Sequence, residues 1–146
     1  MSLRVDYGKI APDAAKAMYA TNRYLDDSSM DQRLRRLIEL CVSQINGCSY
    51  CIWLHSRQAG ELGEPEERIA GVANWRDADC YSDAEQAAFA WTESVTRIAD
   101  GTPPAEQFAA LQGHFDDRQI VDLTATAANM NALNRLGISM RLEPPE

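Results

Sequence analysis

Apolar residues recur at spacings of three and four along almost the whole chain, which places side chains of one kind on one face of an α-helix. Helices are therefore expected over residues 12–25, 28–46, 48–63, 65–72, 82–98, 104–115 and 116–138. No segment shows the strict alternation of a half-buried β-strand, and no linker or internal repeat divides the sequence. The pattern predicts an all-α bundle of six or seven helices, with residues 1–146 forming a single domain.

Several helix ends carry sequence signals of their own. Ser82 and Glu85 have the spacing of a capping box, and Asp116 with Gln119 offers a further cap. Gly47 supplies the left-handed residue that commonly ends a helix. On the last predicted helix, Asn131 and Asn134 share a stripe with apolar residues. Because buried amides need hydrogen-bond partners, oligomer contacts are a plausible outlet for this pair.

Composition narrows the class of protein. Hydrophobic residues make up 45% and charged residues 25% of the 146 residues, which are ordinary globular values. No apolar run approaches the ~20 residues of a membrane span, and the N-terminus has no apolar signal core, so the expected location is the cytoplasm. The net charge of −8 disfavours binding to nucleic acid or anionic membranes. The cluster of Arg33, Arg35 and Arg36 is expected to form a solvated helix face.

The chemistry concentrates in the stretch NGCSYCIWLHS, residues 46–56. Cys48 and Cys51 stand at the start of a predicted helix, where free N–H groups and the helix dipole stabilise a thiolate. His55 follows Cys51 by one helical turn and is placed to take the thiol proton. Cys48 could then attack a sulfenic acid formed on Cys51 and close a disulfide.

Other interpretations of this cysteine pair remain open. Zinc could bind Cys48, Cys51 and His55, with a fourth ligand from Cys41, Cys80 or His114, although the second ligand pair typical of structural zinc sites is missing. Alternatively, the two cysteines could simply fill the core. A thioredoxin-like domain is disfavoured because the chain lacks the βαβ context.

Three segments resemble a known family. The run VSQINGCSYCIWLHSRQAGELG, residues 42–63, resembles the core motif of AhpD-like alkylhydroperoxidases within the carboxymuconolactone decarboxylase family. FAWTE (89–93) and NALNRLGISMR (131–141) resemble later blocks of the small members. The resemblance implies an all-helical, AhpD-like subunit that assembles into trimers or hexamers. It places the CxxC motif at a helix N-terminus near a subunit interface, and it implies no metal or flavin in the subunit.

The resemblance also assigns roles in antioxidant defence. It makes Cys51 the peroxidatic thiol that attacks a hydroperoxide, Cys48 the resolving thiol and His55 a proton-relay base. A dithiol reductant or redox adaptor protein would then reduce the disulfide. The decarboxylase that gives the family its name acts without such a cysteine pair, so lactone decarboxylation is disfavoured.

The sequence departs from the family pattern at two positions. The best-studied members have a histidine immediately before the second cysteine, where this chain has Tyr50. They also have a relay glutamate twelve residues before the first cysteine, where this chain has Arg36. The nearest acid is Glu39, which substitutes if the fold aims it at His55 and otherwise pairs with the arginines on a solvated face.

The remaining expectations concern residues outside the relay. Cys41 is expected in the core and Cys80 in a polar loop, while Trp53 is placed to shape a hydrophobic substrate entrance.

Beside the function of a thiol peroxidase or dithiol oxidoreductase, a second function stays open. It is a non-catalytic helical protein whose dithiol switches its oligomerisation or its interactions.

Overall fold

A computed structural model describes residues 2–146. Over these residues the chain forms eight α-helices, two short 3₁₀ helices and no β-strand. The elements are α1 (Tyr7–Ile10), α2 (Pro12–Asp26), α3 (Gln32–Asn46), α4 (Ser49–Glu61), α5 (Glu66–Gly71), η1 (Val72–Asp77), α6 (Asp83–Thr96), η2 (Ile98–Asp100), α7 (Ala105–Gln112) and α8 (Asp117–Met140). The all-α prediction is confirmed, with α1 as one helix more than expected. None of the described helices has the length and apolar character needed to cross a membrane.

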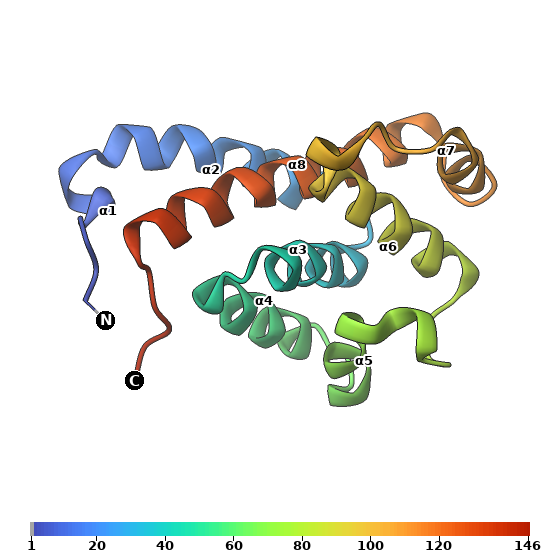
Figure 1. Cartoon of the computed structure of the whole chain (residues 1–146), viewed down its shortest axis with the longest axis horizontal. Helices are drawn as coiled ribbons and strands as arrows, with labels where there is room; N and C mark the ends of the chain where they lie inside the picture. Colours follow the sequence, from blue (N-terminus) through green and yellow to red (C-terminus); the bar gives the residue numbers. More distant parts are fainter. Residues whose placement is uncertain (1) are drawn as a thin grey trace.

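Helix α3 lies at the centre of the bundle and contacts α4, α6 and α8, while α2 packs along α8 (Figure 1). The apolar residues of α3 recur on two sides of the helix and so contribute to two hydrophobic clusters. One cluster contains Ile38 and Val42 of α3 together with both cysteines of the CxxC motif. The other contains Leu37 and Leu40 and packs against α6. Because α3 is buried on both sides, its polar residues also become enclosed.

The capping signals place most helix ends correctly. The predicted capping box forms at Ser82 with Glu85, and the predicted cap at Asp116 with Gln119 also takes the form of a capping box. The start of α3 differs from the expected position near Ser28, because the Asp31 side chain accepts a hydrogen bond from the Arg33 amide and caps the helix there.

The two asparagines of α8 find their partners within the chain. The Asn46 side chain donates to Asn131 at 2.9 Å and to Asn134 at 3.1 Å. The Asn134 amide donates in turn to Ser43 Oγ, and Asn131 donates to Thr96. The expectation that oligomer contacts would satisfy these amides was therefore wrong. They hold α8 against α3 and α6 inside the bundle.

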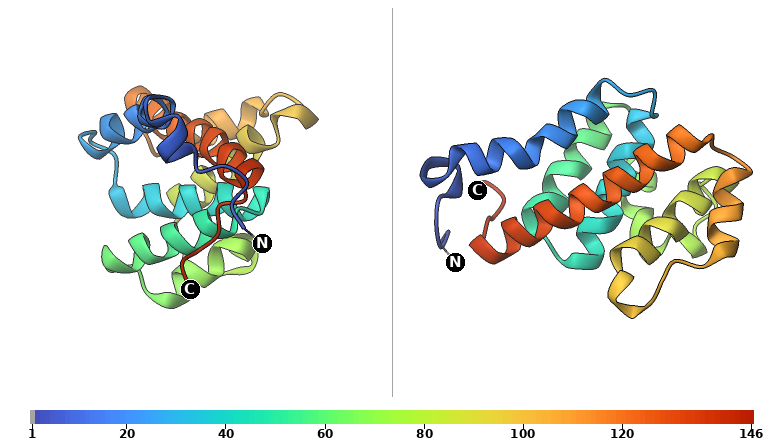
Figure 2. Two further views of the ribbon diagram at one scale, coloured as in Figure 1. Left: turned by 90° about the vertical axis from the view of Figure 1, so that its left-hand side faces the viewer. Right: turned by 90° about the horizontal axis from the view of Figure 1, so that it is seen from above.

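The described N-terminal residues and the C-terminal tail lie near each other and near the start of α4 (Figures 1 and 2). The Arg4 amide donates to the carbonyl of Met140 at 2.8 Å, and its guanidinium donates to the carbonyl of Ser139. α8 ends at Met140, its C-cap residue Arg141 adopts a left-handed conformation, and the Leu142 amide donates a hydrogen bond to the Gly137 carbonyl. These contacts direct residues from both ends of the chain toward the same helix terminus.

Candidate redox site

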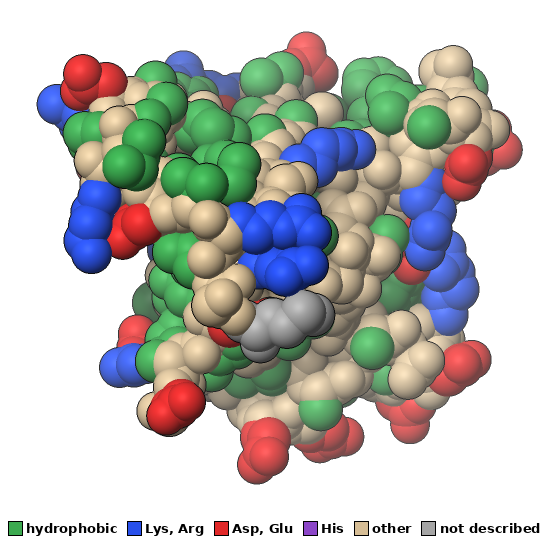
Figure 3. Space-filling model, turned by 60° about the vertical axis from the view of Figure 1, so that its left-hand side comes forward, with side chains coloured by type: hydrophobic (Ala, Val, Ile, Leu, Met, Phe, Trp, Pro, Cys, Tyr) green, Lys and Arg blue, Asp and Glu red, His purple; other side chains and the backbone are tan. Residues whose placement is uncertain are grey.

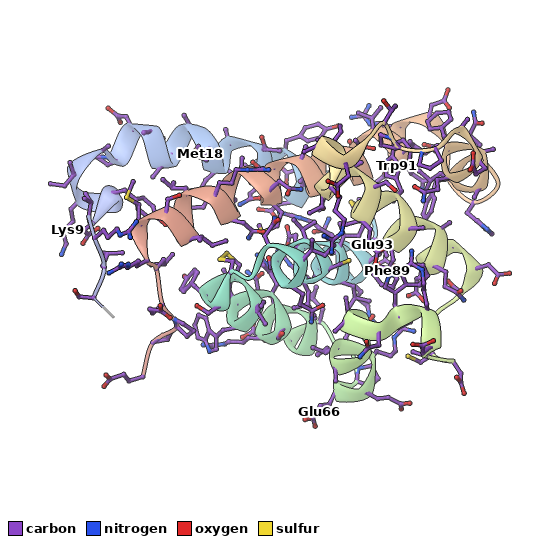
Figure 4. All side chains as sticks on the ribbon, viewed as in Figure 1. Lys9, Met18, Glu66, Phe89, Trp91 and Glu93 are labelled. Atoms are coloured by element: carbon purple, nitrogen blue, oxygen red, sulfur yellow. A yellow bond between two sulfur atoms is a disulfide. The ribbon has the colours of Figure 1, made fainter. Side chains whose placement is uncertain are left out.

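Local sequence places the two cysteines at the N-terminus of α4. Gly47 ends α3 in the left-handed region with φ 74°, and the chain turns directly into Cys48, the N-cap residue of α4. Cys48 and Cys51 form a disulfide with a Cα–Cα distance of 5.3 Å, visible beside the start of α4 in Figure 4. Cys48 is buried next to α8, where a Cβ added to Gly137 would lie 3.7 Å from its sulfur. α8 therefore packs directly against the disulfide at Gly137.

Cys51 rather than Cys48 faces a small cavity of about 60 Å³. Residues of α1, α2, α4, α8 and the C-terminal tail surround it. The lining residues are Tyr7, Tyr19, Asn22, Tyr50, Cys51, Leu54, His55, Met130, Leu133, Gly137 and Leu142. Only 6% of Cys51 is exposed, so the cavity is the approach to its sulfur.

His55 lines the same cavity one helical turn after Cys51 and is held from behind by Glu39. Its Nδ1 lies 3.0 Å from Glu39 Oε2 and 2.9 Å from Gln58 Oε1. A ring nitrogen beside a carboxylate carries the proton, which leaves Nε2 as the basic nitrogen of the neutral imidazole. The arrangement therefore provides a base that can exchange a proton with a group in the cavity.

Glu39 is 2% exposed and is fixed by two arginines of its own helix. Arg35 Nε contacts Glu39 Oε1 at 3.0 Å, and Arg36 contacts Oε2 at 2.8 Å. Arg35 is itself 1% exposed and also bonds to Asp26 and to Asn22 of α2. The expected solvated arginine face was therefore wrong for Arg35, because α2 covers this side of α3.

These contacts determine the charge of Glu39. Burial on its own raises the pKa of a carboxyl group. Here the hydrogen bond from His55, and then the charges of His55, Arg36 and Arg35, outweigh burial and lower the pKa of Glu39 to about 2. Glu39 is thus an anion at neutral pH and accepts a hydrogen bond from Nδ1 of His55.

Stability is expected to fall in acid because of Glu39. Its folded pKa of about 2 lies below the ordinary value of 4.5, so the stability that it contributes is complete above about pH 5 and is lost as the pH falls toward 2. Guanidinium unfolding between pH 7 and pH 3 should show wild type losing more free energy than Glu39→Gln. Other carboxyl groups contribute equally to both proteins, so identical pH slopes would contradict this pairing.

Tyr50 and Trp53 occupy different surroundings. Tyr50 lines the cavity beside Cys51, and its ring lies tilted against that of Trp53, with the ring centroids 5.6 Å apart. Trp53 is absent from the cavity lining, so the prediction that it shapes the entrance was wrong. The helical turn of α4 instead brings Leu54 to the cavity, because Trp53 lies on another side of the helix.

Some site residues were not predicted from the sequence. Gln58 lies one helical turn from His55, so its spacing could have indicated the contact. The pairing of Glu39 with Arg35 was considered only on a solvated face, not in a buried network. Tyr7 and Leu142 reach the cavity from segments far from the motif and carry no comparable signal.

The other thiols lie away from this cavity. Cys41 is buried, and its burial raises the pKa of its thiol to about 12, which keeps it protonated. Cys80 is partly exposed in the segment before α6. Over residues 2–146, no group of three or more His, Cys, Asp and Glu side chains is arranged to hold a metal ion.

The comparisons with known proteins agree with this architecture. Residues 12–94 match the model of the carboxymuconolactone decarboxylase family. The uncharacterised protein YdfG of Bacillus subtilis is 39% identical over 140 residues, which cover 96% of this chain and 95% of YdfG.

Solved structures share the same fold. A protein of unknown function from Agrobacterium tumefaciens, provisionally described as the antioxidant defence protein AhpD, superposes with a TM-score of 0.96 at 33% identity over 99% of both chains. A peroxidase-related protein with an AhpD core from Ralstonia eutropha JMP134 gives a TM-score of 0.85 at 23% identity over 95% of this chain and 74% of its own. The debrominase Bmp8 superposes with a TM-score of 0.76 at 22% identity, over 91% of this chain and 71% of its own.

The two structures below 25% identity establish the fold alone. The family model, by contrast, covers more than half of the chain, and the Bacillus relative matches it nearly from end to end. Together with the all-helical architecture and the CxxC motif at a helix N-terminus, they place the protein in the carboxymuconolactone decarboxylase family, with an AhpD-like fold.

Proposed function

We propose that the protein is a thiol-dependent alkylhydroperoxidase of peroxiredoxin type, acting in antioxidant defence. The observation that carries the proposal is a closed Cys48–Cys51 disulfide whose second sulfur shares a cavity with a carboxylate-paired histidine. The similar Agrobacterium protein, provisionally assigned to antioxidant defence, supports this choice of chemistry.

In the proposed first step, His55 takes the proton of the Cys51 thiol, and the resulting thiolate attacks the terminal oxygen of a hydroperoxide, ROOH. The S–O bond forms, the O–O bond breaks, and the alkoxide leaves as the alcohol after taking a proton from His55. Sulfur is oxidised to sulfenic acid and the peroxide is reduced. The Glu39 carboxylate stabilises the protonated His55 before the transfer.

In the second step, Cys48 attacks the Cys51 sulfenic acid. The S–S bond forms, the S–O bond breaks, and hydroxide leaves as water with the proton of the Cys48 thiol. An external dithiol, free or on a redox adaptor protein, then reduces the disulfide by thiol exchange and becomes oxidised itself. Each cycle consumes one hydroperoxide and one dithiol.

The proposal is tested by counting thiols after the fully reduced protein is mixed with hydrogen peroxide or ethyl hydroperoxide. Wild type is expected to lose two of its four thiols for each peroxide consumed, because one disulfide forms. Cys80→Ser, altered outside the site, should lose two thiols at the wild-type rate. If Cys51→Ser consumes peroxide as fast as wild type, the assignment is wrong.

The alternative is a non-catalytic dithiol that switches oligomerisation or partner binding. Its signature is a change in oligomer size on oxidation, by light scattering, without turnover under an added dithiol reductant. The trimer or hexamer implied by the family resemblance stays a prediction, which the same measurement on reduced protein checks.

A further inference from the structure

We infer that Tyr7 and Leu142, from opposite ends of the chain, restrict the Cys51 cavity to small, uncharged hydroperoxides and exclude those with a bulky group next to the O–O bond. This inference rests on the proposed function and names its substrate class. Both residues line the cavity, but neither belongs to the long helices that form the rest of its wall.

The size of the cavity supports this selection. Its volume is about 60 Å³. An apolar cavity that holds benzene measures about 150 Å³, so a phenyl-bearing hydroperoxide does not fit beside Cys51 while both side chains stay in place. Hydrogen peroxide and short primary alkyl hydroperoxides need far less space around the reacting oxygen.

The character of the lining supports an uncharged substrate. Leu54, Met130 and Leu133 provide an apolar wall. Burial, followed by the neighbouring Tyr19, raises the pKa of Tyr7 to about 12, so its phenol remains neutral. The ionisable groups of the lining are the three tyrosines, Cys51 and His55, and none of them is a fixed cation for an anionic substrate.

The two restricting residues are attached differently from the helical wall. Tyr7 lies on α1, a helix of only four residues that is joined to the end of α8 through Arg4. Leu142 follows the end of α8, and the adjacent Glu143 accepts a hydrogen bond from Ser49 at 3.1 Å. Figure 3 shows the charged and apolar side chains on the side of the molecule where the chain ends lie. Because neither Tyr7 nor Leu142 belongs to α4, shortening either of these two side chains should widen the cavity without disturbing that helix.

The test compares hydrogen peroxide, ethyl hydroperoxide and cumene hydroperoxide as oxidants of the reduced protein. Tyr7→Ala is expected to raise the ratio of the cumene hydroperoxide rate to the hydrogen peroxide rate about tenfold, the discrimination that pocket shape commonly provides. Leu142→Ala should shift the rates in the same direction. Tyr7→Phe keeps the ring and should retain wild-type selectivity, as should Ile10→Ala, altered on the exposed side of α1.

A second measurement keeps this inference separate from the peroxidase assignment. Labelling of Cys51 by iodoacetamide and by the bulkier N-phenylmaleimide is followed by fragment-ion mass spectrometry. Tyr7→Ala should accelerate the bulky reagent selectively, even if wild type consumes no peroxide and the proposed function fails. If Tyr7→Ala and Leu142→Ala change both reagents and all peroxides equally, or change none, the size restriction is wrong.

Discussion

Replacing His55 with asparagine is expected to slow the oxidation of Cys51 by hydrogen peroxide by about 10²–10⁴-fold, the usual contribution of a positioned acid–base group. The variant removes the imidazole that shares the cavity with Cys51 and that Glu39 holds at 3.0 Å. Without the imidazole, the Cys51 thiol must lose its proton to water, and the leaving alkoxide must take its proton from water. The rate of thiol loss after mixing reduced protein with peroxide measures the effect.

The sequence provides a matched control, because His114 is the only other histidine. It is exposed and lies away from the cavity, so His114→Asn should react at the wild-type rate. A structural role of His55 is distinguished by oxidising His55→Asn with diamide, which should still close the Cys48–Cys51 disulfide. Peroxide oxidation of His55→Asn at the wild-type rate would remove His55 from the mechanism.

Replacing Glu39 with alanine is expected to lower the free energy of unfolding by about 3–5 kcal/mol, the cost of removing one partner from a buried ion pair. Arg35 is 1% exposed and would lose its contact to Glu39 Oε1 while remaining enclosed by α2. His55 would lose its carboxylate partner as well. Because domains of this size are stable by about 5–15 kcal/mol, guanidinium unfolding should show a large shift.

An exposed ion pair provides the comparison. Arg57 and Glu61 form a contact of 2.9 Å on α4, with more than half of each side chain exposed. Exposed pairs contribute about 0–1 kcal/mol, so Glu61→Ala should change stability little. Equal losses for Glu39→Ala and Glu61→Ala would show that the buried network does not stabilise the fold. Glu39→Gln, which keeps the shape, should fall between wild type and Glu39→Ala.

Local patterns in the sequence were sufficient to predict the helices other than α1 and the position of the cysteine pair. A glycine that favours the left-handed region ends α3, and the CxxC motif starts the next helix. These signals act within one or two turns, so they survive without knowledge of the tertiary structure. For the same reason, the one-turn spacing from Cys51 to His55 already indicated a thiol with a base beside it.

The surroundings of the dithiol were decided by packing. Glu39 meets His55 because α3 lies against α4, and Arg35 is buried because α2 covers it. The same packing turned the expected arginine surface into part of an enclosed network, and it satisfied Asn131 and Asn134 within the bundle. Helical periodicity states which residues share a face but not which neighbour covers that face.

The amino-acid sequence by itself therefore determined the helical class, the dithiol at a helix N-terminus and the histidine one turn later. Only the tertiary structure decided that Glu39 stands behind His55, that Cys51 rather than Cys48 faces the cavity, and that Tyr7 and Leu142 complete its wall. The physical reason is chain distance. Helical spacing correlates residues within about two turns, whereas contacts between the two ends of a chain depend on how the whole bundle closes.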